Sequence, residues 1–210
     1  KQAVIPCGGL GTRLGNLTKK IPKPLISINK KPVIDHIVKN LSRFGIEEVL
    51  LLCFYKYYLF KKKYHNKFFY GVKIKCIKEK KLLGTSGALL NAKKYLNSHF
   101  LFCNADTFFD ININDLTYKF FKKKLIAFMA LKKMKNIKRY DGYQINKKNI
   151  LIDNQKNKKK LINSGIVIFS KKVVKYLKKK GSLEKQVYPK LIKKKKIDEK
   201  KYNNNFIDMG

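Results

Sequence analysis

The sequence contains no tryptophan and little negative charge, because only 13 aspartates and glutamates stand against 50 lysines and arginines. It also lacks a long apolar run, since the longest, VLLLCFY, is far shorter than the about 20 apolar residues that a membrane-spanning helix requires. The chain shows no charged and then apolar leader segment. We therefore expect a cytoplasmic protein without a membrane partner.

Cysteine is also scarce, and no two cysteines have the CxxC spacing of zinc or redox motifs. Each cysteine lies in or at the end of an apolar run of the kind that forms strands. We expect small buried thiols in a reducing compartment, without disulfides or zinc, at Cys7, Cys53, Cys76 and Cys103.

The excess of positive charge, formally +37, is typical of proteins that bind nucleic acids or anionic membranes. Arginine, whose planar fork suits phosphates and base edges, is nearly absent, with only Arg13, Arg43 and Arg139. Lysine is instead spread along almost every polar segment, which favours a solvated surface with weak, salt-sensitive adhesion to polyanions. A basic nucleic-acid-binding module remains an alternative from a different functional class.

The length and the pattern of the chain predict one α/β domain. A chain of 210 residues with 44% hydrophobic residues can build a single core. In the first half, strand-like runs such as AVIP and HFLFCN alternate with helical segments, and the helix from Pro32 ends at Gly45. This alternation predicts a mainly parallel sheet with right-handed crossovers, followed by shorter mixed strands and by helices near 171–179 and 182–193.

The segment CGGLGTRL, residues 7–14, follows the first strand, at the sheet edge where parallel sheets bind their ligands. It is not a Walker A loop, because Arg13 and Leu14 stand where that motif requires glycine and lysine. It is not a dinucleotide fingerprint either, because Leu14 replaces the third glycine and the acidic partner is missing from the expected region, which reads IPKPL.

Four motifs remain: GGLGTRL, PKPL, LGTSGA and NAD. In this order and spacing they make the chain resemble the sugar-phosphate nucleotidyltransferases, nearly end to end. Within this family the chain looks similar first to the guanylyltransferases that act on D-glycero-α-D-manno-heptose 1-phosphate, and in second place to mannose-1-phosphate guanylyltransferases. The resemblance implies a single-domain Rossmann-like three-layer fold with a mainly parallel mixed sheet over 1–210. Nucleotide binding is expected from 1–110 and sugar-phosphate binding from 111–210.

The reaction implied by the resemblance joins two anions: an oxygen of a sugar 1-phosphate attacks the α-phosphorus of a nucleoside triphosphate, and pyrophosphate leaves. Glycine lets backbone N–H groups approach the phosphates closely. We expect Arg13 and Lys23, the latter held between two prolines, to contact phosphates and to act with Asp106 in catalysis. The residues expected to bind the nucleotide are Gly8, Gly9, Gly11, Thr12, Arg13, Glu79, Leu83, Gly84, Thr85 and Gly87.

Asp106 ends an apolar strand, where a carboxylate favours a cation as its partner. The resemblance implies Mg²⁺ held by Asp106 and by Asp208 of FIDMG, with the ion bridging the phosphates. Ala105 stands between Asn104 and Asp106, where the family usually has glycine.

For the sugar phosphate, the resemblance indicates Asn104 together with Asn163 and Gly165 of INSGIVIF. The Glu-Lys pair of the family corresponds here to Gln155 and Lys156, and the glutamine retains hydrogen bonding without the charge. The sugar-phosphate-binding residues expected are therefore Asn104, Gln155, Lys156, Asn163 and Gly165.

The residues alone leave the base open between guanine, uracil and thymine, and the resemblance favours GTP. A uridylyl- or thymidylyltransferase acting on a hexose 1-phosphate remains an alternative, as does a catalytically silent regulatory subunit. The aromatic segment FYKYYLF predicts packing of a helix on the sheet or a contact between copies in a homo-oligomer.

Overall fold

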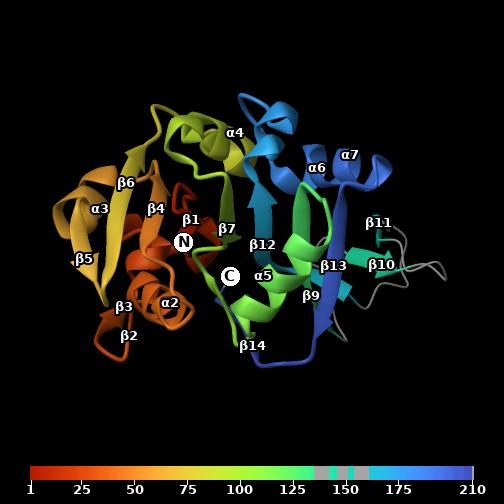
Figure 1. Cartoon of the computed structure of the whole chain (residues 1–210). Coiled ribbons are helices and arrows are strands. Elements are labelled where there is room, and N and C mark those ends of the chain that lie inside the picture. The colour runs from red at the N-terminus through yellow and green to blue at the C-terminus, as the bar shows by residue number, and fades with distance from the viewer. Residues whose placement is uncertain (135–141, 146–150, 154–160, 210) are drawn as a thin grey trace.

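The computed structural model describes residues 1–134, 142–145, 151–153 and 161–209. Its centre is a parallel sheet with strands in the order β7-β1-β4-β6 (Figure 1). Ala3 of β1 lies opposite Val49 of β4 on one side and Leu101 of β7 on the other. The four strands are apolar runs at β1 (Gln2–Pro6), β4 (Glu48–Cys53), β6 (Val72–Lys78) and β7 (His99–Cys103).

The second half of the chain adds mixed strands to this sheet. β12 runs antiparallel to both β7 and β9, and β13 lies parallel to β9. β10 and β11 extend the sheet beyond β12, and β5 pairs with β6 at the opposite edge. The bounds are β5 (Lys67–Phe69), β9 (Ala127–Lys133), β10 (Gly142–Ile145), β11 (Leu151–Asp153), β12 (Leu161–Ser170) and β13 (Ile197–Tyr202).

Helices cover both faces of the sheet, so the predicted three-layer α/β fold is confirmed. Buried residues of α2, α3 and α5 share one core cluster with the sheet, and those of α4, α6 and α7 share a second cluster on the other face (Figure 1). Within the described residues, every helix is too short or too polar to span a lipid bilayer. The bounds are α2 (Val33–Ser42), α3 (Tyr57–Tyr64), α4 (Gly84–Asn91), α5 (Ile113–Lys122), α6 (Leu183–Gln186) and α7 (Tyr188–Lys193), with 3-10 helices η3 (Lys93–Tyr95) and η4 (Lys171–Tyr176).

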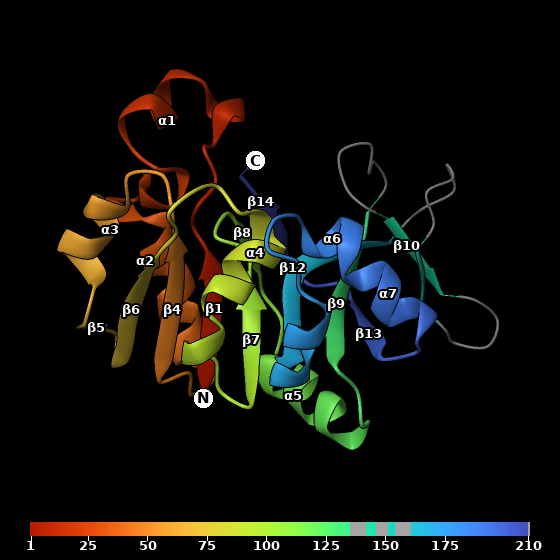
Figure 2. The same cartoon turned by 90° about the horizontal axis from the view of Figure 1, so that it is seen from above.

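Short elements surround the carboxyl ends of the central strands. The glycine segment after β1 leads into a loop that carries α1, and β14 pairs with β8 just after β7. Figure 2 shows the α1 loop and the C-terminal end on the same side of the molecule. These elements are η1 (Thr12–Leu14), α1 (Asn16–Lys20), η2 (Lys23–Leu25), β2 (Ser27–Ile28), β3 (Lys31–Pro32), β8 (Thr107–Phe109) and β14 (Phe206–Asp208).

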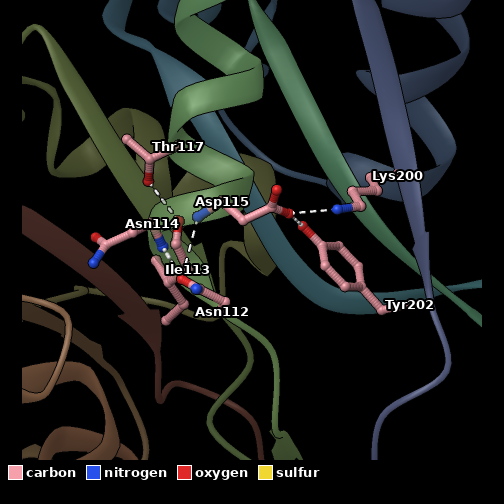
Figure 3. A network of polar contacts seen from close by, with 7 residues as sticks. All are labelled: Asn112, Ile113, Asn114, Asp115, Thr117, Lys200 and Tyr202. Atoms are coloured by element: carbon pink, nitrogen blue, oxygen red, sulfur yellow. Dashed lines mark hydrogen bonds and ion pairs between the residues drawn. The ribbon is translucent and has the colours of Figure 1, made fainter.

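Polar contacts fix the start of α5 (Figure 3). The side chain of Asn112 accepts hydrogen bonds from the backbone N–H groups of Asn114 and Asp115, at 3.0 and 3.2 Å, which caps the helix. Asp115 in turn accepts hydrogen bonds from Lys200 Nζ at 2.7 Å and from the Tyr202 hydroxyl at 2.6 Å. These two donors lower the pKa of Asp115 and tie α5 to β13.

Several expectations about elements hold, and others change in detail. All four cysteines are buried free thiols, as predicted. The helix predicted from Pro32 begins at Val33, because Lys31 and Pro32 pair with the short strand before them. The segment near 171–179 forms a 3-10 helix over Lys171–Tyr176, and the segment 182–193 divides into α6 and α7, with a proline in the first turn of α7.

Candidate functional site

A cavity of about 410 Å³ lies at the carboxyl ends of β1, β6 and β7, the edge at which the sequence predicts ligand binding. It gathers the glycine segment, the proline-flanked lysine, the start of α4 and the NAD motif from four separate parts of the chain. The predicted site residues that line it are Gly8, Gly9, Gly11, Thr12, Lys23, Glu79, Gly84, Thr85, Asn104 and Asp106.

Glycine at two positions of the glycine segment leaves room for neighbouring side chains. A Cβ added at Gly8 would lie 2.7 Å from Oε1 of Glu79. Gly11 has φ 67°, and a Cβ there would lie 2.8 Å from the Thr18 side chain. The Thr18 hydroxyl reaches the carbonyl oxygens of Gly11 and Gly15, at 3.0 and 3.1 Å, and so holds the loop in this shape.

Lys23 and Asp106, predicted separately as a phosphate ligand and a metal ligand, are in direct contact. Lys23 Nζ lies 2.6 Å from Oδ2 of Asp106, and the two side chains are 9% and 27% exposed. Asp106 also accepts a hydrogen bond from Thr107 Oγ1 at 3.3 Å. The cavity therefore contains a largely buried ion pair, whose carboxylate has the oxygen chemistry that a hard divalent cation prefers.

Glu79 forms part of the cavity wall directly after β6. It is only 3% exposed, and its Oε2 accepts a hydrogen bond from the backbone N–H of Leu83 at 3.3 Å. Burial raises the pKa of Glu79 to about 7, and the N–H of Leu83 partly opposes this rise. The carboxylate beside the glycine segment is consequently poised to change charge near neutral pH.

The segment LGTSGA is fixed by contacts with the loop that precedes α6. Gly84 has φ 71°, and a Cβ there would lie 2.4 Å from the carbonyl oxygen of Gly181. The N–H of Ser86 donates to that same oxygen at 2.9 Å, and Thr85 Oγ1 accepts a hydrogen bond from the N–H of Leu183 at 2.8 Å. α4 has no side-chain cap, so Thr85 and Ser86 bond to this loop and not to the N-terminal turn of their own helix.

Asn104, Asn163 and Gly165 form a second group beside the cavity. The N–H of Asn104 donates to the carbonyl oxygen of Gly165 at 2.9 Å, and Asn163 Oδ1 accepts from the N–H of Gly165 at 3.0 Å. Gly165 has φ 81°, and a Cβ there would lie 2.5 Å from Nδ2 of Asn104. The close approach of β12 to the end of β7 thus depends on glycine at this position.

Glu184 lines the cavity, although the sequence analysis did not identify it. It lies in the first turn of α6, and its Oε2 accepts a hydrogen bond from Thr85 Oγ1 at 3.4 Å. In the sequence, the segment SLEK has the form of an ordinary helix start, with Ser182 as the cap and an acidic residue after it. That local pattern conceals the position of this carboxylate within the cavity.

The remaining predicted residues lie near the cavity or outside the described structure. Asp208 of β14 is paired opposite Thr107, and the N–H of Met209 donates to the carbonyl oxygen of Asp106 at 3.1 Å. Leu83 and Gly87 flank the lining residues of α4, where a Cβ added at Gly87 would lie 2.8 Å from Cβ of Leu83. The Arg13 side chain and the predicted sugar contacts Gln155 and Lys156 lie outside the described residues.

Within the described residues, histidine, cysteine and acidic side chains form no group of three or more that could hold a metal ion. The site predicted for Mg²⁺ has two carboxylates: Asp208 of β14 lies opposite Thr107 of β8, and Asp106 directly precedes that strand. A two-carboxylate site is completed by phosphate and water oxygens, so this donor set fits Mg²⁺.

Comparison with known proteins finds relatives that span the whole chain. The family model of the nucleotidyl transferases matches residues 2–210. The chain is 37% identical over 214 residues to the D-glycero-alpha-D-manno-heptose 1-phosphate guanylyltransferase of Campylobacter jejuni subsp. jejuni serotype O:2, with 100% of this chain and 94% of the relative covered. It is 29% identical to the enzyme of the same name from Aneurinibacillus thermoaerophilus, with 100% and 93% covered.

Solved structures show the same architecture. HddC from Yersinia pseudotuberculosis, crystallised with GMP-PN, superimposes with a TM-score of 0.81 at 27% sequence identity, covering 99% of this chain and 92% of HddC. A Bacillus anthracis protein described as a putative glucose-1-phosphate thymidylyltransferase has a TM-score of 0.86 at 18% identity, with 99% and 89% covered. At that identity the second likeness concerns the fold alone.

Proposed function

Because this chain belongs to the nucleotidyl transferase family, we propose that it transfers GMP from GTP to a heptose- or mannose-type sugar 1-phosphate, releasing pyrophosphate and forming a GDP-sugar. One observation carries the proposal: a single cavity combines the glycine segment, the Lys23–Asp106 pair and the buried carboxylate of Glu79. The similarity to two heptose 1-phosphate guanylyltransferases over their nearly full lengths supports the choice of reaction.

In the proposed reaction an oxygen of the sugar 1-phosphate forms a bond to the α-phosphorus of GTP. The bond from that phosphorus to the bridging oxygen breaks, and the electron pair leaves with pyrophosphate. The main task of the protein is to hold two anions in line. We assign the backbone N–H groups of Gly8, Gly9 and Gly11 and the side chains of Arg13 and Lys23 to the phosphates, because they supply positive charge at this edge of the sheet.

The same proposal assigns Mg²⁺ to Asp106 and Asp208. When bound, this ion would neutralise phosphate charge and orient the triphosphate. Lys23 stays within reach of Asp106 and can neutralise the carboxylate before the substrates arrive.

Guanine is supported by the hydrogen-bonding capacity of Glu79. An ionised carboxylate only accepts hydrogen bonds, and guanine presents two donors, N1–H and the N2 amino group, on one edge. Uracil and thymine present a single N3–H between two carbonyl oxygens, which repel a carboxylate. We therefore assign Glu79 to the base, with Leu83, Gly84, Thr85 and Gly87 shaping the surrounding backbone.

We assign the second half of the chain to the sugar phosphate. The residues that would contact it there are Gln155, Lys156, Asn163 and Gly165, and Asn104, which follows β7, would join them. The GDP-sugar formed would serve as the activated donor in the synthesis of a surface polysaccharide, with its formation in the cytoplasm.

The proposal is tested by a grid of the four common nucleoside triphosphates against heptose, mannose and glucose 1-phosphates, read by release of pyrophosphate with and without Mg²⁺. We expect release only when GTP, a manno-configured sugar 1-phosphate and Mg²⁺ are all present. The Asp106→Asn variant, which preserves size, should lose activity by at least about 100-fold. Equal activity with UTP, or full activity of this variant, would contradict the assignment.

A further inference from the structure

The cavity contains a carboxylate whose role the proposed reaction does not yet explain. Among the described lining residues the carboxylates are Glu79, Asp106 and Glu184. Asp106 is paired with Lys23, and Glu79 lies against Gly8 and Leu83. Glu184 comes from α6, which packs against α4.

Glu184 contacts the start of α4. Its Oε2 accepts the hydroxyl of Thr85 at 3.4 Å, and Thr85 also lines the cavity. Tyr188 of α7 is fully buried, and deep burial and then the charge of Glu184 raise the pKa of its hydroxyl.

The chemistry of a carboxylate restricts what it can contact in this cavity. Phosphate oxygens repel it, so it does not serve the triphosphate end, where the glycine segment and Lys23 gather positive charge and N–H donors. Ionised carboxylates accept hydrogen bonds from hydroxyl groups, and such charge-assisted bonds are stronger than neutral ones. A sugar 1-phosphate carries several hydroxyl donors on the ring that leads away from its phosphate.

We propose that Glu184 accepts hydrogen bonds from ring hydroxyl groups of the sugar 1-phosphate and thereby selects the sugar. This inference rests on the proposed guanylyltransferase reaction and adds a substrate contact to it. Thr85, which touches Glu184 from the α4 segment, orients the carboxylate, so the nucleotide and sugar parts of the cavity share this pair.

The test compares wild type with Glu184→Gln in steady-state pyrophosphate release, using GTP and whichever heptose or mannose 1-phosphate the wild type accepts. Glutamine preserves the size and an acceptor for Thr85 but loses the charge. We expect KM for the sugar 1-phosphate to rise about 10- to 100-fold, while KM for GTP changes by less than about threefold. Thermal unfolding of both proteins shows whether the fold is retained.

Two further measurements show whether Glu184 contacts the sugar and which hydroxyl group it contacts. Calorimetry with GDP and with GDP-mannose should show equal affinity of wild type and variant for GDP, but weaker binding of GDP-mannose by the variant. Deoxy analogues of the sugar 1-phosphate should identify the hydroxyl concerned, because the difference between wild type and variant disappears when that hydroxyl is absent. The matched control is Glu47→Gln, an exposed carboxylate paired with the N-terminal amine, which should leave both KM values unchanged.

The outcomes separate this inference from the proposed function. Suppose that the wild type is active and that Glu184→Gln has either an unchanged KM for the sugar 1-phosphate or a raised KM for GTP alone. Either result overturns the proposed sugar contact but does not contradict the proposed reaction. A wild type that releases no pyrophosphate with any sugar 1-phosphate overturns the proposed function and this inference together.

Discussion

Lys23 and Asp106 illustrate how single residues carry opposite charge into one cavity. The lysine is largely buried, and its amine lies 2.6 Å from the carboxylate, so neither charge is left uncompensated without substrates. In the proposed reaction the two groups acquire separate partners, because a cation takes the carboxylate and a phosphate takes the ammonium group. Charge balance is then maintained before and after substrate binding.

Glu79 supports a prediction about pH. Its folded-state pKa of about 7 lies above its ordinary value of 4.5 because of burial, so the free folded protein binds this proton more tightly than the unfolded chain. This residue therefore contributes most to stability below pH 4.5, and the contribution is lost as pH rises through about 7. Guanine binding has the opposite dependence, because the donors of guanine favour the ionised carboxylate.

We accordingly expect the affinity for GTP to fall as pH decreases below about 7, by up to about tenfold per pH unit. Calorimetry between about pH 5.5 and 8.5 measures this for wild type and Glu79→Gln. In the variant, the affinity for GTP should vary with pH only as far as the titration of the triphosphate itself requires. The variant should also accept UTP better than the wild type does, because an amide offers both a hydrogen-bond donor and an acceptor. Identical pH profiles for the two proteins would exclude Glu79 from base recognition.

At the scale of elements, glycine determines how closely segments approach. Gly84 of α4 and Gly165 of β12 both have positive φ, and each lies where a Cβ would collide with a neighbouring residue. Gly84 thereby lets α4 approach the backbone of Gly181, and Gly165 leaves room for the side chain of Asn104. The cavity shape depends on these contacts as much as on the polar residues that line it.

The cap of α5 allows a stability prediction at this scale. Asn112 accepts two backbone N–H groups at the start of the helix, so Asn112→Ala should lower the free energy of unfolding by about 1 kcal/mol. Urea denaturation measures the change, and Asn112→Asp is the matched control because aspartate caps equally well. GTP affinity should stay the same in both variants, since α5 contributes no residue to the described lining. Equal stability of the alanine and aspartate variants would contradict the role of the cap.

At the scale of the whole molecule, the dominant property is the net charge of +37. It attracts any polyanion through the release of counterions, without requiring a specific site. The charge and the cavity are separate features, because lysine is distributed along the whole sequence and Lys23 alone among the lysines belongs to the described lining.

We therefore expect duplex DNA and single-stranded RNA to bind weakly and without sequence preference. Fluorescence anisotropy should show the affinity falling steeply between about 50 mM and 200 mM salt. Addition of saturating RNA at the higher salt concentration should leave pyrophosphate release unchanged. Sequence-dependent binding that persists at that concentration would instead favour the nucleic-acid-binding alternative.

Local chain chemistry was sufficient to predict the fold class, the buried thiols and most of the residues that line the cavity around the glycine segment. Apolar runs that alternate with amphipathic helical segments indicate parallel strands joined by crossover connections. The carboxyl ends of such strands lie at one edge of the sheet. Residues directly after a strand, such as Glu79 and Asp106, could therefore be placed together without coordinates.

Tertiary structure alone decided the contacts that depend on packing between distant segments. The pairing of Lys23 with Asp106 and the position of Glu184 in the cavity follow from how the loops and α6 pack, and no short pattern in the sequence encodes such distances. β13 was also missed, because its sequence IDEKKY has more charged than apolar residues and forms a strand by pairing with β9. Local periodicity thus sufficed for the parallel strands of the first half of the chain and for the edge at which their carboxyl ends meet, but not for β13. Only the folded chain determined which side chains meet there, because each contact arises from the register and approach of segments far apart in the sequence.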